Sequence, residues 1–205
     1  MLKQFLIAAA AVFAFAPFAP ALAEATPGKP APAISATDVA GKPLKLEDFR
    51  GKYVVLEWFN PSCPFVVKHY GSSNMQGLQQ RLTGDGVVWI AVNSTAADHS
   101  EFLPAAKAAE WMQQQRATPT RVVLDPAGTI GRAYGARTTP QMVIIDPKGT
   151  VVYNGAIDSI RSANPADVPK ATNFVTQAFA ELKAGKPVSQ PTTQPYGCSV
   201  KYTAG

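Results

Sequence analysis

The stretch that decides the fold is Glu57-Trp58-Phe59-Asn60-Pro61-Ser62-Cys63-Pro64-Phe65-Val66-Val67-Lys68-His69. The apolar run over residues 53–59 predicts a buried strand, and residues 60–62 predict a turn. Pro64 suits the first turn of a helix, where its missing N–H costs nothing. Cys63 is therefore expected at the positive end of a helix, among unpaired backbone N–H groups that favour a thiolate.

The N-terminus has the order of features of a signal peptide over residues 1–23. Lys3 supplies a basic start, an apolar stretch interrupted by two prolines follows, and Ala21-Leu22-Ala23 has the small-x-small form of a cleavage site. An uncleaved membrane anchor is the alternative, and the prolines and the cleavage site argue against it. The mature chain is predicted to begin at Glu24, to be exported without stable membrane insertion and, in a bacterium, to be periplasmic.

Length and charge limit the function classes. The mature chain is long enough for one well-packed domain, predicted over residues 24–187, and a Pro/Thr/Gln-rich tail over residues 188–205 is predicted to be flexible and carries Cys198. The formal net charge of +5 comes from scattered Lys and Arg residues, so no nucleic-acid partner is expected.

Turn signals and hydrophobic periodicity predict alternating strands and helices. The predicted strands cover residues 53–59, 87–92, 121–124, 142–145 and 151–153, and the predicted helices cover 63–82 and 104–116, a short segment around 130–134, and a segment that begins at Pro165. A hairpin with its turn at residues 40–42 precedes them. This order predicts an α/β fold with a central mixed sheet and helices on both faces.

At this point the chain resembles the thioredoxin fold in its peroxiredoxin-like branch, the alkyl hydroperoxide reductase and thiol-specific antioxidant (AhpC/TSA) group of redoxins. The resemblance rests on residues 41–52, on the turn that leads into Cys63, and on Thr138-Thr139-Pro140 with the strand that follows. The tail segment 197–202 is also similar to segments of redoxins. The resemblance implies that the Thr139–Pro140 peptide bond is cis and faces the cysteine.

The same resemblance implies an enzyme, either a thiol-dependent peroxidase or a thiol–disulfide oxidoreductase. Its substrate would be a peroxide or a protein disulfide, and a thiol reductant protein would regenerate it. Pro64, Thr139 and Pro140 are the implied substrate-binding residues. Two departures are visible: Val66 stands where thioredoxins carry their second cysteine, and Asn60 and Leu56 stand where peroxiredoxins carry a threonine and a proline.

The two cysteines each have two interpretations. Cys63 is either a small buried apolar residue or, as its place at a helix start favours, a reactive nucleophile. Cys198 is either half of a structural disulfide or the resolving thiol of a reversible pair, and the second interpretation is preferred. The predicted disulfide joins Cys63 and Cys198 within one chain or between two.

Four further residues are candidates for supporting roles. Glu57 matches the buried acid of thioredoxins, which relays protons, and a solvated edge carboxylate is the alternative. Arg137 is expected to hold a thiolate and polarise a peroxide oxygen, or else to be an exposed loop cation. His69 and Lys68 lie on the same predicted helix as Cys63. The spacing does not place His69 on the helix face of Cys63, so it is either a surface or hydrogen-bonded histidine or a residue with a chemical role, and Lys68 is similarly ambiguous.

No motif for a phosphate, flavin or nicotinamide group is present, so no cofactor is predicted. A second function class stays open: an exported copper metallochaperone of thioredoxin fold, in which Cys63, His69 and Cys198 would have to converge. The spacing of these three residues does not itself predict a metal site.

Overall fold

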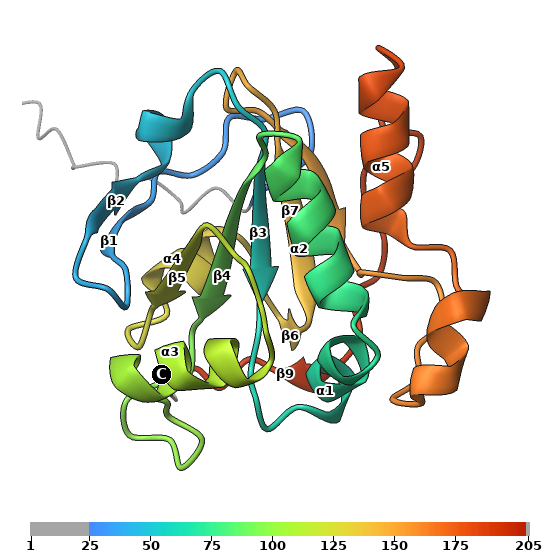
Figure 1. Cartoon of the computed structure of the whole chain (residues 1–205). Helices are drawn as coiled ribbons and strands as arrows, with labels where there is room; N and C mark the ends of the chain where they lie inside the picture. Colours follow the sequence, from blue (N-terminus) through green and yellow to red (C-terminus); the bar gives the residue numbers. More distant parts are fainter. Residues whose placement is uncertain (1–24, 204–205) are drawn as a thin grey trace, which may run out of the picture.

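The central strand of the molecule is β3 (Val54–Trp58). A computed structural model describes residues 25–203, so the predicted signal peptide and Glu24 lie outside the described residues. β3 pairs in parallel with β4 (Val88–Asn93), and β4 pairs in parallel with β5 (Arg121–Leu124). On its other side β3 pairs antiparallel with β7 (Gln141–Ile145), which pairs antiparallel with β8 (Val151–Gly155). The five-stranded mixed sheet thus has the order β5-β4-β3-β7-β8 (Figure 1).

Alternation along β3 sends its side chains into two cores. Val55 and, just beyond the strand, Phe59 belong to a core that also contains Cys63, whereas Leu56 and Trp58 belong to the core on the opposite face. All of these residues are buried, as expected of a strand in the middle of a sheet covered on both sides.

Helices cover both faces of the sheet, as the sequence predicts. The core that contains Cys63 is covered by α1 (Pro64–Gly71), α2 (Asn74–Gly84), α3 (Ala105–Gln114) and α5 (Phe174–Lys183). The opposite core is covered by α4 (Thr129–Ala133) and by the hairpin of β1 (Ser35–Thr37) and β2 (Pro43–Lys45). Short 3₁₀ helices, η1 (Leu46–Phe49) and η2 (Pro165–Lys170), lie in the connections.

The helix predicted over residues 63–82 is divided into two. Its first part ends at Gly71, and Ser73 takes a left-handed conformation with φ of 59° before α2 begins. Glycine and serine are weak helix formers, and a residue with positive φ cannot continue a helix. The break lets α1 and α2 follow different directions over the same face of the sheet (Figure 1).

The C-terminal tail (residues 188–203 of the described chain) differs from the flexible segment that the sequence predicts. It bridges to β8 at Thr192 and then crosses to β6 (Thr138–Thr139), where β9 (Cys198–Ser199) pairs antiparallel with it (Figure 1). Backbone hydrogen bonds account for the difference, because they hold the tail on both sides of Cys198: Asn154 N–H donates to Pro191, and Ala96 N–H donates to Lys201. Within residues 25–203 no helix has the length and apolar character needed to cross a bilayer.

Candidate active site

Cys63 lies where β3 gives way to α1, as the sequence predicts. It is the N-cap residue of α1, and Pro64 occupies the first helical turn. Its backbone N–H donates to the Asn60 carbonyl at 3.0 Å, which closes the turn. The residue is only 1% exposed, and its Sγ donates to the Thr139 carbonyl oxygen at 3.0 Å.

The Thr139–Pro140 bond is cis, and the carbonyl of Thr139 faces Cys63, as expected. Thr139 is buried, and Pro140 connects the short strand β6 to the core strand β7. Of the three residues predicted to bind substrate, Thr139 therefore touches the sulfur directly, while Pro64 adjoins it along the chain.

Cys198 is brought to the same place by the pairing of two short strands. In the register of β6 and β9, Thr139 is directly opposite Cys198, and the Thr139 hydroxyl donates to the Cys198 carbonyl at 3.5 Å. Both cysteines are free thiols in this structure. Burial, followed by a hydrogen bond to Cys63 and the charge of Cys63, raises the pKa of Cys198 to about 12, so Cys198 keeps its proton near pH 7.

Two charged residues that the sequence did not single out lie near this pair. Glu101 accepts from the Asn60 side-chain amide at 2.6 Å, and Asn60 in turn accepts from the Ser62 N–H at 2.8 Å. Beyond the larger causes named above, the charge of Lys201 lowers the pKa of Cys198 and that of Glu101 raises it. Glu101 thus orients the turn before Cys63 and adds negative charge near Cys198.

Glu57 is fully buried, as predicted, but it belongs to a separate group, the β3 carboxylate cluster. Its carboxylate accepts from the Tyr70 hydroxyl at 2.7 Å, from Trp89 Nε1 at 2.8 Å and from Gln79 at 3.1 Å. Burial raises its pKa to about 7, against the lowering effect of those three donors. The described residues provide no direct hydrogen bond between Glu57 and Cys63, and the proton-carrying role of Glu57 stays a prediction.

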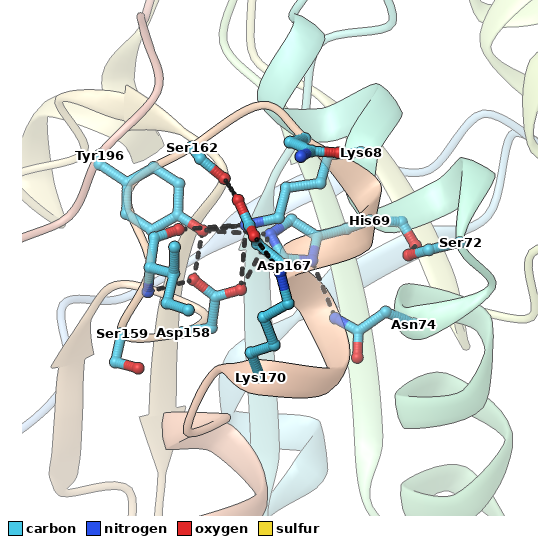
Figure 2. A network of polar contacts seen from close by, with 12 residues as sticks. Lys68, His69, Ser72, Asn74, Asp158, Ser159, Ser162, Asp167, Lys170 and Tyr196 are labelled. Carbon is cyan, nitrogen blue, oxygen red and sulfur yellow. Dashed lines mark hydrogen bonds and ion pairs between the residues drawn. The ribbon is translucent and has the colours of Figure 1, made fainter.

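Lys68 and His69 are buried in a second group, which we name the tail anchor cluster, together with Asp158 and Tyr196 (Figure 2). Lys68 Nζ lies 3.2 Å from Asp158 Oδ2 and 3.2 Å from the Tyr196 hydroxyl. That hydroxyl donates to the other oxygen of Asp158 and lies 3.3 Å from His69 Nε2. The cluster joins α1 to the tail two residues before Cys198.

The ring of His69 is held at both nitrogens. Its Nδ1 lies 2.8 Å from the Asn74 side-chain amide, so the neutral ring accepts there and carries its proton on Nε2. Burial lowers the pKa of His69 to about 4; the Asp158 carboxylate opposes that shift and Lys68 adds to it. His69 is therefore neutral near pH 7 and acts as a structural partner of Tyr196.

The role expected of the Arg137 guanidinium at Cys63 stays a prediction. Arg137 lines a pocket of about 350 Å³ together with residues of the tail and of the N-terminal segment 25–27, and Cys63 is not part of that lining. Its backbone serves the site, because the Arg137 carbonyl accepts from Val200 N–H at 3.0 Å, next to β9.

Cys63, His69 and Cys198 do not form a copper site in the part of the chain that the structure describes. Over residues 25–203 no group of three His, Cys, Asp or Glu side chains is placed to hold a metal ion. His69 uses both ring nitrogens for Asn74 and Tyr196, which leaves Cys63 and Cys198 as the thiols of the site.

The chain matches the model of one protein family and is similar to many solved structures. The model of the AhpC/TSA family matches residues 27–154. An uncharacterized conserved protein from Geobacillus kaustophilus is 26% identical with a TM-score of 0.75, over 88% of this chain and 94% of that one. A hypothetical protein from Sinorhizobium meliloti 1021 is 22% identical with a TM-score of 0.74, over 88% and 96%.

A putative thiol:disulfide interchange protein DsbE from Chlorobium tepidum is 26% identical with a TM-score of 0.51, over 62% of this chain and 83% of that one. No curated protein matches the chain. These likenesses confirm the thioredoxin-like α/β fold that the sequence predicts. They also agree with a redox enzyme whose reacting groups are thiols.

Proposed function

Because the chain belongs to the AhpC/TSA family, we propose that it is an exported thiol-based oxidoreductase in which Cys63 attacks the oxidant and Cys198 resolves the product. The observation that carries the proposal is the double role of Thr139. Its carbonyl accepts from the Cys63 sulfur at 3.0 Å, and its backbone is paired opposite Cys198. One residue therefore positions both sulfurs.

The first step is attack of the Cys63 thiolate on the oxidant. With a hydroperoxide the thiolate takes the terminal oxygen, the O–O bond breaks, and Cys63 becomes a sulfenic acid while an alkoxide or hydroxide leaves. With a disulfide the thiolate bonds one sulfur, the S–S bond breaks, and the other sulfur leaves as a thiolate. The start of α1 supports this step because Cys63 is its N-cap residue, where the positive end of the helix dipole favours an anion.

The second step uses the proton and the sulfur of Cys198. The raised pKa of Cys198 keeps it a thiol near pH 7, so it can donate its proton to the alkoxide or hydroxide that leaves in the first step. The Cys198 thiolate then attacks the Cys63 sulfur and forms the Cys63–Cys198 disulfide; the S–O bond of the sulfenic acid breaks and hydroxide leaves, or the S–S bond of the mixed disulfide breaks and a thiolate leaves, and solvent protonates the leaving anion. Val66 cannot replace it. An external dithiol protein then reduces the disulfide and completes the cycle.

A second function, thiol–disulfide exchange with a protein substrate, is favoured by the likeness to the putative DsbE protein. In either case export rests on the signal-peptide features of residues 1–23 and places the enzyme in the periplasm of a bacterium. Intact mass of the exported protein should match a chain that begins at Glu24.

Single-turnover kinetics of the reduced protein test the proposal. With hydrogen peroxide, wild type should form a disulfide, Cys198→Ser should react once and stop at the sulfenic acid, and Cys63→Ser should not react. The sulfenic acid is trapped with dimedone and located by peptide mass. Turnover of Cys198→Ser at the wild-type rate without added thiol would show that another group resolves the intermediate.

A further inference from the structure

The tail strand β9 occupies the backbone edge that an extended peptide would need. Thr138 and Thr139 are paired antiparallel with Ser199 and Cys198, and Val200 N–H continues the contact by donating to the Arg137 carbonyl. Peptides bind exposed strands by adding a further strand, which uses the same main-chain groups. A peptide can therefore pair with β6 only after β9 has left.

Gly197 lets the backbone of the tail lie in direct contact with the backbone of β6. It has φ of +136°, and a Cβ at this position would lie 1.9 Å from the Thr139 carbonyl oxygen. No residue with a side chain can occupy this position without moving the two backbones apart. The tail is therefore shaped for this edge, next to the carbonyl that accepts from Cys63.

Side chains anchor the tail before and after β9. Before it, the Tyr196 hydroxyl is buried in the tail anchor cluster against Asp158, Lys68 and His69 (Figure 2), and its ring packs edge-on against Phe65 of α1.

After it, the Tyr202 hydroxyl donates to the Ala136 carbonyl at 2.7 Å, and the Arg132 guanidinium lies 4.5 Å from the centre of the Tyr202 ring. Cys198 is thus held between two anchors, in contrast to a tail that only passes near the site.

We propose that β9 is a built-in occupant of the peptide-binding edge, and that the enzyme with its tail docked takes small oxidants and excludes disulfides carried by an extended polypeptide. This rests on the function proposed above, because it takes Cys63 as the attacking thiol. Release of Tyr196 from Asp158 is the step that opens the edge, which makes Tyr196 a positioning residue for Cys198.

The size of the oxidant explains why the docked tail would exclude a polypeptide disulfide but admit a small one. A polypeptide that replaces residues 196–200 needs about 17 Å of free edge at the usual rise of a strand, and all of it is covered by the docked tail. A hydroperoxide or a small disulfide needs only a local opening above the Cys63 sulfur, which is otherwise covered. The chemistry at sulfur is the same for a small and a peptide disulfide: the Cys63 thiolate forms the new S–S bond and one thiolate leaves.

The test compares two disulfides of equal chemistry and different size in a Cys198→Ser background, where the mixed disulfide on Cys63 accumulates. One is hydroxyethyl disulfide, and the other is an unstructured peptide whose single cysteine is joined to mercaptoethanol. The rates are measured by intact mass in this parent protein and after adding Tyr196→Phe or Gly197→Ala. Tyr134→Phe is the matched control, because its hydroxyl donates to the carbonyl of Pro32, which lies outside the tail.

We expect the peptide to react much more slowly than the small disulfide in the parent protein. Loss of the hydrogen bond to Asp158 and of those from Lys68 and His69 should raise the ratio of peptide rate to small-disulfide rate by about tenfold to hundredfold in Tyr196→Phe. Gly197→Ala should raise the same ratio, and Tyr134→Phe should leave it unchanged.

Equal rates for the two disulfides in the parent, or a ratio that neither tail variant changes, would overturn this inference while leaving Cys63 as the nucleophile. Failure of hydroxyethyl disulfide and of hydrogen peroxide to modify Cys63 in every variant would instead overturn the proposed function. The two failures are therefore distinguishable in one set of measurements.

Discussion

The molecule buries two polar clusters beside α1, and they hold together different parts of the chain. In the β3 carboxylate cluster, Glu57 is bound by Tyr70, Gln79 and Trp89, which come from α1, α2 and β4. In the tail anchor cluster, Asp158 is bound by Lys68 of α1 and by Tyr196 of the tail. The first cluster stays within the core of the domain, whereas the second fixes a segment that carries a reacting cysteine.

The difference lies in charge as well as in connectivity. Glu57 is surrounded by neutral donors, and burial raises its pKa to about 7, so a neutral carboxyl is tolerated there. Asp158 faces the buried ammonium of Lys68 at 3.2 Å, with side chains 3% and 0% exposed. A buried ion pair whose partner is removed leaves an uncompensated charge. The tail anchor cluster should therefore be the more sensitive of the two.

The largest expected effect follows from breaking that ion pair. Asp158→Asn should lower the free energy of unfolding by about 3–5 kcal/mol, because it removes the carboxylate that compensates the buried Lys68 side chain. Glu57→Gln is the matched carboxyl-to-amide change in the other cluster and should cost about 1 kcal/mol or less. Urea unfolding at pH 7 measures both. A larger loss in Glu57→Gln would reverse the comparison.

The pH dependence of stability should separate the clusters next. The pKa of Glu57 rises from 4.5 to about 7 on folding, so the folded chain holds a proton that the unfolded chain releases; this contribution is full below pH 4.5 and lost as the pH rises to 7. The pKa of His69 falls from 6.5 to about 4, so its contribution is lost as the pH falls from 6.5 to 4. Each amounts to about 3 kcal/mol.

In wild type these two slopes oppose each other between pH 4.5 and 6.5. Glu57→Gln should remove the first, so that stability rises with pH over this range, and His69→Gln should leave a fall with pH. Unfolding curves at several pH values provide the measurement. Parallel pH profiles in the two variants would contradict the assigned protonation states.

Removing one hydroxyl from each cluster should have a smaller effect on stability. Hydrogen exchange at single amides then shows which part of the chain each hydroxyl holds in place. Tyr196→Phe should speed hydrogen exchange at the Val200 amide, which donates to Arg137 beside β9, by about tenfold or more. Tyr70→Phe removes a hydroxyl that donates to Glu57. In this variant the ratio of the Val200 exchange rate to the exchange rates of core amides should be the same as in wild type. Equal protection of Val200 in wild type and Tyr196→Phe would mean that the cluster does not anchor the tail.

The smallest effect is expected for a residue that belongs to neither cluster. Arg137 lines a pocket whose lining does not include Cys63, so we expect Arg137→Ala to change the rate of Cys63 oxidation by hydrogen peroxide by about twofold or less, because solvent and salt screen a charge that does not contact the sulfur. A large loss of rate would support the role that the sequence suggests for this guanidinium.

The sequence predicts the parts of the site that are encoded locally. The apolar run into Asn60-Pro61-Ser62 places Cys63 at a helix start, and a carboxylate in that run predicts a buried acid. The break between α1 and α2 was less visible, because weak helix formers at residues 71–73 lower helix propensity without fixing where a helix ends.

The tail could not be placed in this way. Its contacts join residues far apart, such as Lys68 and Tyr196 at a separation of 128 positions, and β6 and β9 have only two residues each. Such short strands carry no periodicity, and Asp158 belongs to no motif. The composition of the tail predicts a flexible segment, and only its tertiary contacts with β6, β8 and α1 give it a fixed course.

The most direct test of the account is the identity of the bond formed when the reduced protein meets one equivalent of hydrogen peroxide. Peptide mapping without reduction should recover the Cys63 and Cys198 peptides joined by a disulfide, with intact mass showing a single chain that has lost two hydrogen atoms, because Thr139 positions both sulfurs in one molecule. A product in which Cys63 carries a sulfenic acid while Cys198 remains a free thiol would contradict it.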